Sequence, residues 1–169
     1  ISKLAPSSVD LTTTGLKKTI YEHTFDTLAA GQSGYALNPN NTTYITATNG
    51  KLTLANQTAA TLGTQKLSLL LVPGKNGLTG KFAFEIDAAS SVLNASTTGI
   101  VINLGENATG VQNCANLTIY STNIKYTDNT GEQTVNKKYF ANGEDVRVKF
   151  IVDVDANTYD SYINDQVVV

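Results

Sequence analysis

Glu85 and Asp87 are the acidic residues whose spacing is most suggestive of chemistry, because only Ile86 separates them. Side chains two residues apart on a β-strand point to the same face, so the two carboxylates would lie side by side. Two carboxyls about 5 Å apart can hydrolyse a glycosidic bond, one as the nucleophile and the other as the proton donor. The alternative is a charge ladder in which these acids pair with Lys149 or Arg147 on a neighbouring strand, and we favour this interpretation.

A second acidic pattern, Asp153-x-Asp155-x-Asn157, has the alternating spacing of a calcium-binding loop. A loop of that type also needs a glycine at its sixth position and a bidentate glutamate at its twelfth. Thr158 and Asn164 occupy these two positions here. We therefore interpret the segment as the turn of a β-hairpin rather than as a metal site.

The chain contains one cysteine, Cys114, and one histidine, His23. An intrachain disulfide and a zinc site built from several cysteines are therefore excluded. A cysteine nucleophile would need a nearby base, and His23 lies in a distant segment, although sequence distance alone does not exclude a contact. We interpret Cys114 as a small structural residue and His23 as a half-exposed strand residue, and we predict no catalytic residue.

The composition narrows the class of protein. The chain has 169 residues, enough for one domain with a sizeable core. It is 41% apolar and 15% charged, and its many Thr, Asn, Ser and Gly residues favour strands and turns over a helical bundle. A net charge of -2 with a single arginine provides no basic surface for nucleic acid or an anionic membrane. The longest apolar run, Leu69 to Val72, is too short to span a bilayer.

Residues 1–15 are rich in Ser and Thr and contain no apolar segment of the kind found in signal peptides. We expect them to form a linker or N-terminal extension before one domain over residues 16–169. The chain is therefore predicted to be a mature or excised piece of a longer protein that is secreted or lies at the cell surface.

Apolar and polar residues alternate along most of the chain after residue 19, which predicts β-strands. The clearest strand is Asp145 to Val154, in which Phe150 and four valines, Val154 among them, point to one face. Lys81 to Asp87 repeats the pattern, with Phe82, Phe84 and Ile86 inward. Further strands are predicted at Thr19–Phe25, Tyr44–Ala47, Lys51–Ala55, Leu67–Val72, Gly99–Leu104, Leu117–Ser121, Ile124–Thr127, Gln133–Asn136 and Tyr159–Ile163.

Turn residues separate these strands. Asn49-Gly50 suits a tight hairpin with positive φ, and similar signals occur at Asp128–Gly131, Ala141–Gly143 and Asp155–Thr158. Many short strands joined by turns, with no helix between them, predict antiparallel sheets packed face to face. The predicted fold is all-β, a two-sheet antiparallel β-sandwich.

Three stretches resemble the jelly-roll domains of the concanavalin A-like lectin and glucanase superfamily. Tyr21 to Asp26 (YEHTFD) is similar to the first strand of many such domains. Tyr44 to Leu54 (YITATNGKLTL) resembles their second hairpin, and Asp145 to Val168 resembles their strand–turn–strand ending in a Y-I-N corner. The resemblance implies a jelly roll. Family members close with another strand beside the first, so the closing strand here is expected to be shortened, or the chain cut before it.

Laminarinase-type glycoside hydrolases of this superfamily carry E-x-D-x-x-E on one strand. Glu85 and Asp87 match the first two acids, but the third position is Ser90. A retaining mechanism requires both carboxyls, so the resemblance does not extend to hydrolysis by this motif. A polysaccharide lyase would need a base within a cation-rich subsite, which a single histidine and a single arginine do not favour.

Sugar-binding modules of this fold stack pyranose rings on aromatic side chains, while amide and acid groups bond the hydroxyls. The chain has no Trp, so tyrosines would have to serve, although several can equally lie at the rim of the core. The candidate ligand-binding residues are the tyrosines Tyr35, Tyr44, Tyr120, Tyr126 and Tyr139 and the polar residues Glu85, Asp87, Asn103, Asn123 and Arg147.

A structural Ca2+ is common in the superfamily near the first strand and the final corner, which points to Glu22, Asp26 and Asp165. The leading hypothesis is a non-catalytic carbohydrate-binding module of a larger secreted polysaccharide-degrading or surface protein. Its partners would be a polysaccharide or other glycan and the neighbouring modules of a longer chain. The alternatives are a structural or adhesive surface domain that contacts proteins, and a hydrolase or lyase with an unrecognised site.

Overall fold

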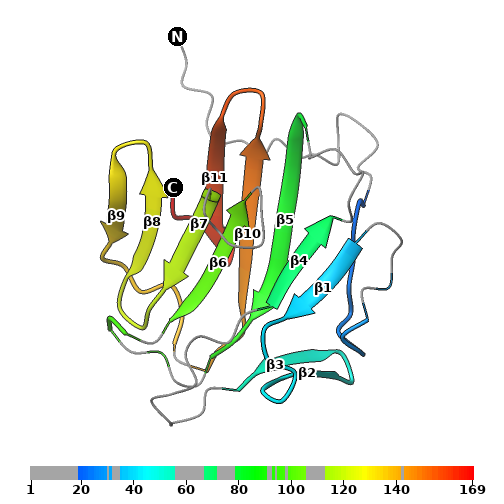
Figure 1. The fold of residues 1–169 in the computed structure, drawn as a ribbon. Helices are drawn as coiled ribbons and strands as arrows, with labels where there is room; N and C mark the ends of the chain where they lie inside the picture. Colours follow the sequence, from blue (N-terminus) through cyan, green and yellow to red (C-terminus); the bar gives the residue numbers. More distant parts are fainter. Residues whose placement is uncertain are drawn as a thin grey trace. The chain divides into compact units, whose positions relative to one another are not determined.

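A computed structural model describes residues 19–29, 31, 35–55, 67–71, 79–90, 93, 95–97, 99–105, 113–141 and 143–169. These residues form twelve β-strands and contain no helix, and every strand pair is antiparallel (Figure 1). The all-β, antiparallel class predicted from the sequence is therefore confirmed. The chain forms two compact units, Ile1–Val72 and Pro73–Val169. The expected linker over residues 1–15 lies outside the described residues.

The first unit contains two small sheets. In one, β1 (Tyr35–Pro39) pairs with β4 (Leu67–Leu71). In the other, β2 (Ile45–Thr48) and β3 (Lys51–Leu54) form a hairpin around Asn49-Gly50. Both turn residues have positive φ, 51° and 76°, the conformation that Asn-Gly favours in a two-residue hairpin loop. This predicted turn is confirmed.

The second unit contains two four-stranded sheets. Sheet I has the order β12-β11-β10-β5, and sheet II has the order β6-β7-β8-β9. The strands of sheet I are β5 (Lys81–Ala88), β10 (Val146–Asp153), β11 (Thr158–Ile163) and β12 (Gln166–Val167). The strands of sheet II are β6 (Ile100–Gly105), β7 (Asn113–Ile119), β8 (Ile124–Asp128) and β9 (Gly131–Val135).

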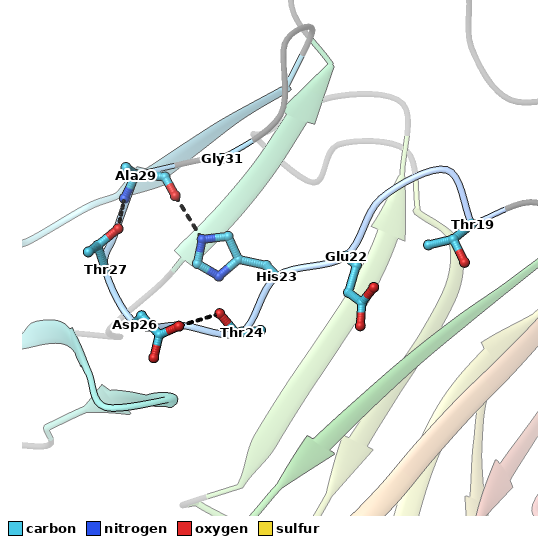
Figure 2. Close-up of a pocket in the computed structure, with 8 residues that line it drawn as sticks. All are labelled: Thr19, Glu22, His23, Thr24, Asp26, Thr27, Ala29 and Gly31. Atoms are coloured by element: carbon cyan, nitrogen blue, oxygen red, sulfur yellow. Dashed lines mark hydrogen bonds between the residues drawn. The ribbon is translucent and has the colours of Figure 1, made fainter.

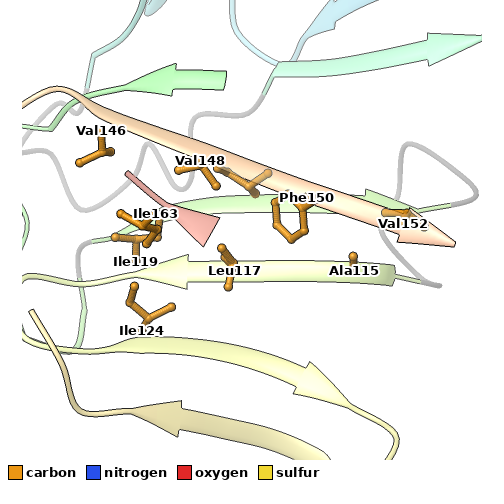
Figure 3. Close-up of a cluster of buried hydrophobic side chains, with 10 residues drawn as sticks. Ala115, Leu117, Ile119, Ile124, Val146, Val148, Phe150, Val152 and Ile163 are labelled. Carbon is orange, nitrogen blue, oxygen red and sulfur yellow. The ribbon is translucent and has the colours of Figure 1, made fainter. Parts of the chain in front are cut away.

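Buried residues from sheets I and II contribute to one hydrophobic cluster (Figure 3). The alternation of β10 explains its share of the cluster, because every second residue from Val146 to Val152 is buried. The cluster consists of Val146, Val148, Phe150, Val152 and Ile163 from sheet I and Ile102, Ala115, Leu117, Ile119 and Ile124 from sheet II. Its partly buried neighbours include Phe82, Phe84 and Ile86, the residues of β5 that were predicted to point inward.

Several predicted strands need correction. Thr19–Phe25 forms no strand, and Phe25 has a φ of 58°, which interrupts an extended backbone. Val154 was expected to be buried, but it is 42% exposed because β10 ends at Asp153 and a turn follows. The strands β1 and β12 were not predicted. The finer fold prediction, one jelly roll over residues 16–169, stays a prediction.

Tyr159 links the two sheets of the second unit through its hydroxyl group. Its ring packs against Phe150, with ring centroids 6.1 Å apart, and its hydroxyl donates a hydrogen bond to the Thr127 carbonyl oxygen at 2.9 Å. The same hydroxyl is hydrogen-bonded to the backbone of Asn116 in β7. Burial first, and then the nearby Tyr126 and Asp128, raise the pKa of this hydroxyl.

We expect Tyr159→Phe to lower the free energy of unfolding by about 0.5–1.5 kcal/mol at pH 8, because Thr127 and Asn116 lose their partner. The pKa of Tyr159 is higher in the folded protein than in the unfolded chain, so the unfolded phenol loses its proton first. The free energy of unfolding of wild type therefore falls as pH rises above the ordinary tyrosine value of about 10. The deficit of the variant should therefore shrink at pH 11. Urea unfolding at both pH values measures this, and a deficit that is constant with pH would contradict the prediction.

Candidate functional site

The structure distributes the ten ligand-binding candidates over four places. Tyr35 and Tyr44 belong to the first unit. In the second unit, Tyr126 and Tyr139 pack against the hydrophobic cluster. The other candidates occupy sheet II or the turn beside it (Asn103, Tyr120 and Asn123) and the solvent-facing side of sheet I (Glu85, Asp87 and Arg147). Only this last group brings acids and a base together on adjacent strands.

The solvent-facing side of sheet I, which we call the ladder face, is made of the residues that alternate with the buried ones. Antiparallel pairing aligns them in rows across the strands, Arg147 opposite Asp87 and Lys149 opposite both Glu85 and Tyr162. The ladder face comprises Lys81, Ala83, Glu85 and Asp87 from β5, Arg147, Lys149, Ile151 and Asp153 from β10, and Thr158, Asp160 and Tyr162 from β11.

Three ion pairs run along the ladder face between β5 and β10. Lys81 Nζ lies 3.1 Å from Asp153 Oδ2, Arg147 Nε lies 3.1 Å from Asp87 Oδ1, and Lys149 Nζ lies 3.6 Å from Glu85 Oε1. The predicted pairing of Glu85 and Asp87 with Lys149 and Arg147 is confirmed. The hydrogen bond from Arg147 to Asp87 and the charge of that carboxylate raise the pKa of the guanidinium.

Tyr162 places an aromatic ring on the ladder face, and it was missing from the candidates chosen by sequence. It is half-buried and lies opposite Lys149 on one side and Val167 of β12 on the other. Burial and, to a smaller extent, Asp160 raise the pKa of its hydroxyl. The alternation along this strand was the sequence signal that could have identified Tyr162. Its two neighbours, Ser161 and Ile163, are buried, so its own side chain points to the opposite, solvent-facing side.

Tyr139 is half-buried at the edge of the cluster, and contacts occupy its ring and its hydroxyl. The hydroxyl donates a hydrogen bond to the Val167 carbonyl oxygen at 3.2 Å. Lys137 Nζ lies 4.5 Å from the ring centroid and also donates to Gln166 Oε1 at 3.0 Å. These contacts hold β12 in place, which gives Tyr139 a structural role.

Tyr120 and Asn123 flank the turn between β7 and β8, where the Tyr120 backbone N–H donates to the Asn123 carbonyl oxygen at 3.0 Å. The Asn123 side-chain amide donates to the Ala95 carbonyl oxygen at 3.1 Å. Its Oδ1 is buried and has no hydrogen-bond partner among the residues that the structure describes. Because the oxygen is shielded from solvent, this pair offers a ligand one aromatic ring and no accessible amide oxygen.

The first unit contains a cleft of about 630 Å³ around His23 (Figure 2). His23 Nε2 lies 2.7 Å from the Ala29 carbonyl oxygen, and Nδ1 accepts a hydrogen bond from the Phe25 N–H at 2.8 Å. Both ring nitrogens are therefore engaged by the backbone, with Nδ1 as an acceptor. His23 fixes this loop instead of lying in a strand. The cleft is lined by Thr19, Glu22, His23, Thr24, Asp26, Thr27, Ala29 and Gly31.

The three calcium candidates are divided between the two units. Glu22 and Asp26 belong to the first unit, where Thr24 Oγ1 donates to Asp26 Oδ2 at 2.7 Å, and Asp165 follows β11 in the second. Among the residues that the structure describes, no three His, Cys, Asp or Glu side chains are grouped as metal ligands. The Asp153–Asn157 segment is a hairpin turn, as predicted, in which Asp153 Oδ1 accepts from the Ala156 N–H at 3.0 Å.

Comparison of the chain with protein family models, with curated proteins and with solved structures finds no match. In the described ranges, no helix is long and apolar enough to cross a membrane. A functional assignment therefore depends on the chemistry of the chain's own residues, and the ladder face carries the richest set.

Proposed function

We propose that the chain is a non-catalytic carbohydrate-binding module of a larger secreted or surface protein, and that the ladder face holds the glycan. The observation that carries this proposal is the position of Tyr162 in one row with Lys149 and Glu85, beside the row of Arg147 and Asp87. A sugar ring can stack on the tyrosine while its hydroxyl groups reach the charged side chains on the adjacent strands.

The polar groups of the ladder face suit hydroxyl ligands. A sugar hydroxyl both donates and accepts hydrogen bonds, and each ion pair offers an acceptor carboxylate next to a donor cation. The side chains of Arg147 and Asp87 remain 57% and 68% exposed, so solvent, and equally a ligand, can reach both. Hydrogen bonds to charged groups are stronger than those between neutral groups, which favours such pairs as contact points.

Binding fits the ladder face better than hydrolysis. Glu85 and Asp87 each have a cationic partner on β10, at 3.6 and 3.1 Å. Both carboxylates are thus held in ion pairs, whereas a retaining mechanism needs one of them to attack the sugar and the other to donate a proton to the leaving group. Ser90, at the position of the third motif residue, brings no carboxylate. We therefore assign the acids to ligand contact and to sheet cohesion.

Calorimetry or affinity electrophoresis against a panel of plant and microbial glycans tests the proposal. We expect one or more glycans to bind wild type and Tyr162→Ala to weaken that binding about tenfold, roughly 1.4 kcal/mol, through loss of the stacking surface. Tyr120→Ala, a tyrosine outside the ladder face, is the matched control and should bind as wild type does. If no glycan binds, or if Tyr162→Ala binds normally, the assignment is wrong. Release of reducing ends or unsaturated products would overturn the non-catalytic assignment.

A further inference from the structure

The ladder face carries more acidic than basic side chains, and this imbalance bears on whether it can bind a neutral or an anionic glycan. Its three bases all have a carboxylate within 3.6 Å. Asp160, in contrast, pairs with no base among the described residues. The charges of Glu85 and Asp165 also act on Arg147, in addition to its hydrogen-bonded partner Asp87. Acidic groups therefore outnumber basic ones around the ladder face.

An anionic sugar would meet an unfavourable environment there. A uronate or sulfate group could reach the Arg147 guanidinium only by displacing Asp87 or by sharing the cation with it. Sharing places two negative groups a few ångströms apart, where repulsion between like charges is strong, and displacement costs Asp87 its ion pair. A neutral hydroxyl can accept from Arg147 and donate to Asp87 while the ion pair stays intact.

We infer that the ladder face selects neutral glycans and rejects glycans that carry uronate or sulfate groups. This inference rests on the proposed function and specifies its substrate class. The rejection comes from the carboxylates of Glu85 and Asp87, which mask Lys149 and Arg147 from an anionic ligand.

Two pairs of polymers provide the test, and the members of each pair share a backbone and differ in charge. One pair is polygalacturonate and its fully methyl-esterified form, and the other is sulfated galactan and neutral galactan. We expect wild type to bind a neutral polymer of this set at least tenfold more tightly than its anionic counterpart. A preference for the anionic polymer would overturn the inference and leave the proposed function standing. Binding to none of the polymers, neutral or anionic, overturns the inference, and the wider glycan panel then decides whether the proposed function also fails.

The double variant Glu85→Gln/Asp87→Asn tests the masking directly. It uncovers Lys149 and Arg147, so we expect binding to polygalacturonate or sulfated galactan to rise at least tenfold and to disappear near 1 M salt, where the Debye length is about 3 Å. The control Glu144→Gln/Asp155→Asn makes the same change in net charge at residues of the second unit that are not part of the ladder face. If the two double variants bind the anionic polymers equally, masking is not the cause and the inference is wrong.

Discussion

Replacement of Phe150 by alanine is expected to lower the free energy of unfolding by about 3–5 kcal/mol, the largest effect of any change considered for this chain. Phe150 is fully buried and lies in the central part of β10, with a paired strand on each side. Its ring centroid lies 6.4 Å from that of Phe84 and 6.1 Å from that of Tyr159. Alanine would remove apolar surface from the cluster and leave a cavity, and both terms destabilise the native state.

Urea unfolding followed by circular dichroism measures the effect of Phe150→Ala. Domains of this size are commonly stable by about 5–15 kcal/mol, so the variant should unfold at a much lower urea concentration or be only partly folded. Val101→Ala is the control, because Val101 is 55% exposed and a surface change of this kind shifts stability by about 0.5 kcal/mol or less. Equal losses for the two variants would contradict the shared core of sheets I and II.

The strands of the second unit were largely predictable, because alternation marks a strand that buries one face. β5 and β10 begin and end within one residue of the predicted bounds. The ion pairs followed from the same pattern, since the acids of β5 and the bases of β10 all lie on the polar face. Sheet order was not predictable. Arg147 and Asp87 are 60 residues apart, and no local signal specifies that β5 pairs with β10.

The failures have physical causes as well. Tyr21, His23 and Phe25 alternate as strand residues do, but their rings contact one another along the segment, at 6.2 and 4.6 Å between centroids. The ring nitrogens of His23 are hydrogen-bonded to the backbone of Phe25 and Ala29. These bonds take the place of the backbone hydrogen bonds that a neighbouring strand would supply. Tyr162 lies inside the predicted strand Tyr159–Ile163, whereas the candidate tyrosines are those in or beside loops and short polar strands. Its outward direction became clear from its register opposite Lys149.

Gly99→Ala is expected to cost about 1–3 kcal/mol of folding free energy, although Gly99 is only partly buried and lies immediately before β6. A Cβ at this position would lie 2.8 Å from the Ile119 carbonyl oxygen and 3.1 Å from Cδ1 and Cε1 of the Tyr120 ring. The ring must shift by a few tenths of an ångström, whereas the carbonyl belongs to the backbone of β7 and can move only with the strand. A methyl group would therefore push β6 and β7 apart where they meet.

A double-mutant cycle with Tyr120→Ala separates the two contacts. Without the ring, the added methyl group still meets the Ile119 carbonyl oxygen, so the cost of Gly99→Ala should decrease and remain above zero. Thermal or urea unfolding of the four proteins provides the cycle. A cost below about 0.5 kcal/mol in the Tyr120 background would contradict the close approach of the two strands. A cost that Tyr120→Ala leaves unchanged would assign the whole effect to the backbone, because the side chain would then have adjusted freely. The expected intermediate value means that Gly99 is required by β7 itself and by the tyrosine that packs across it.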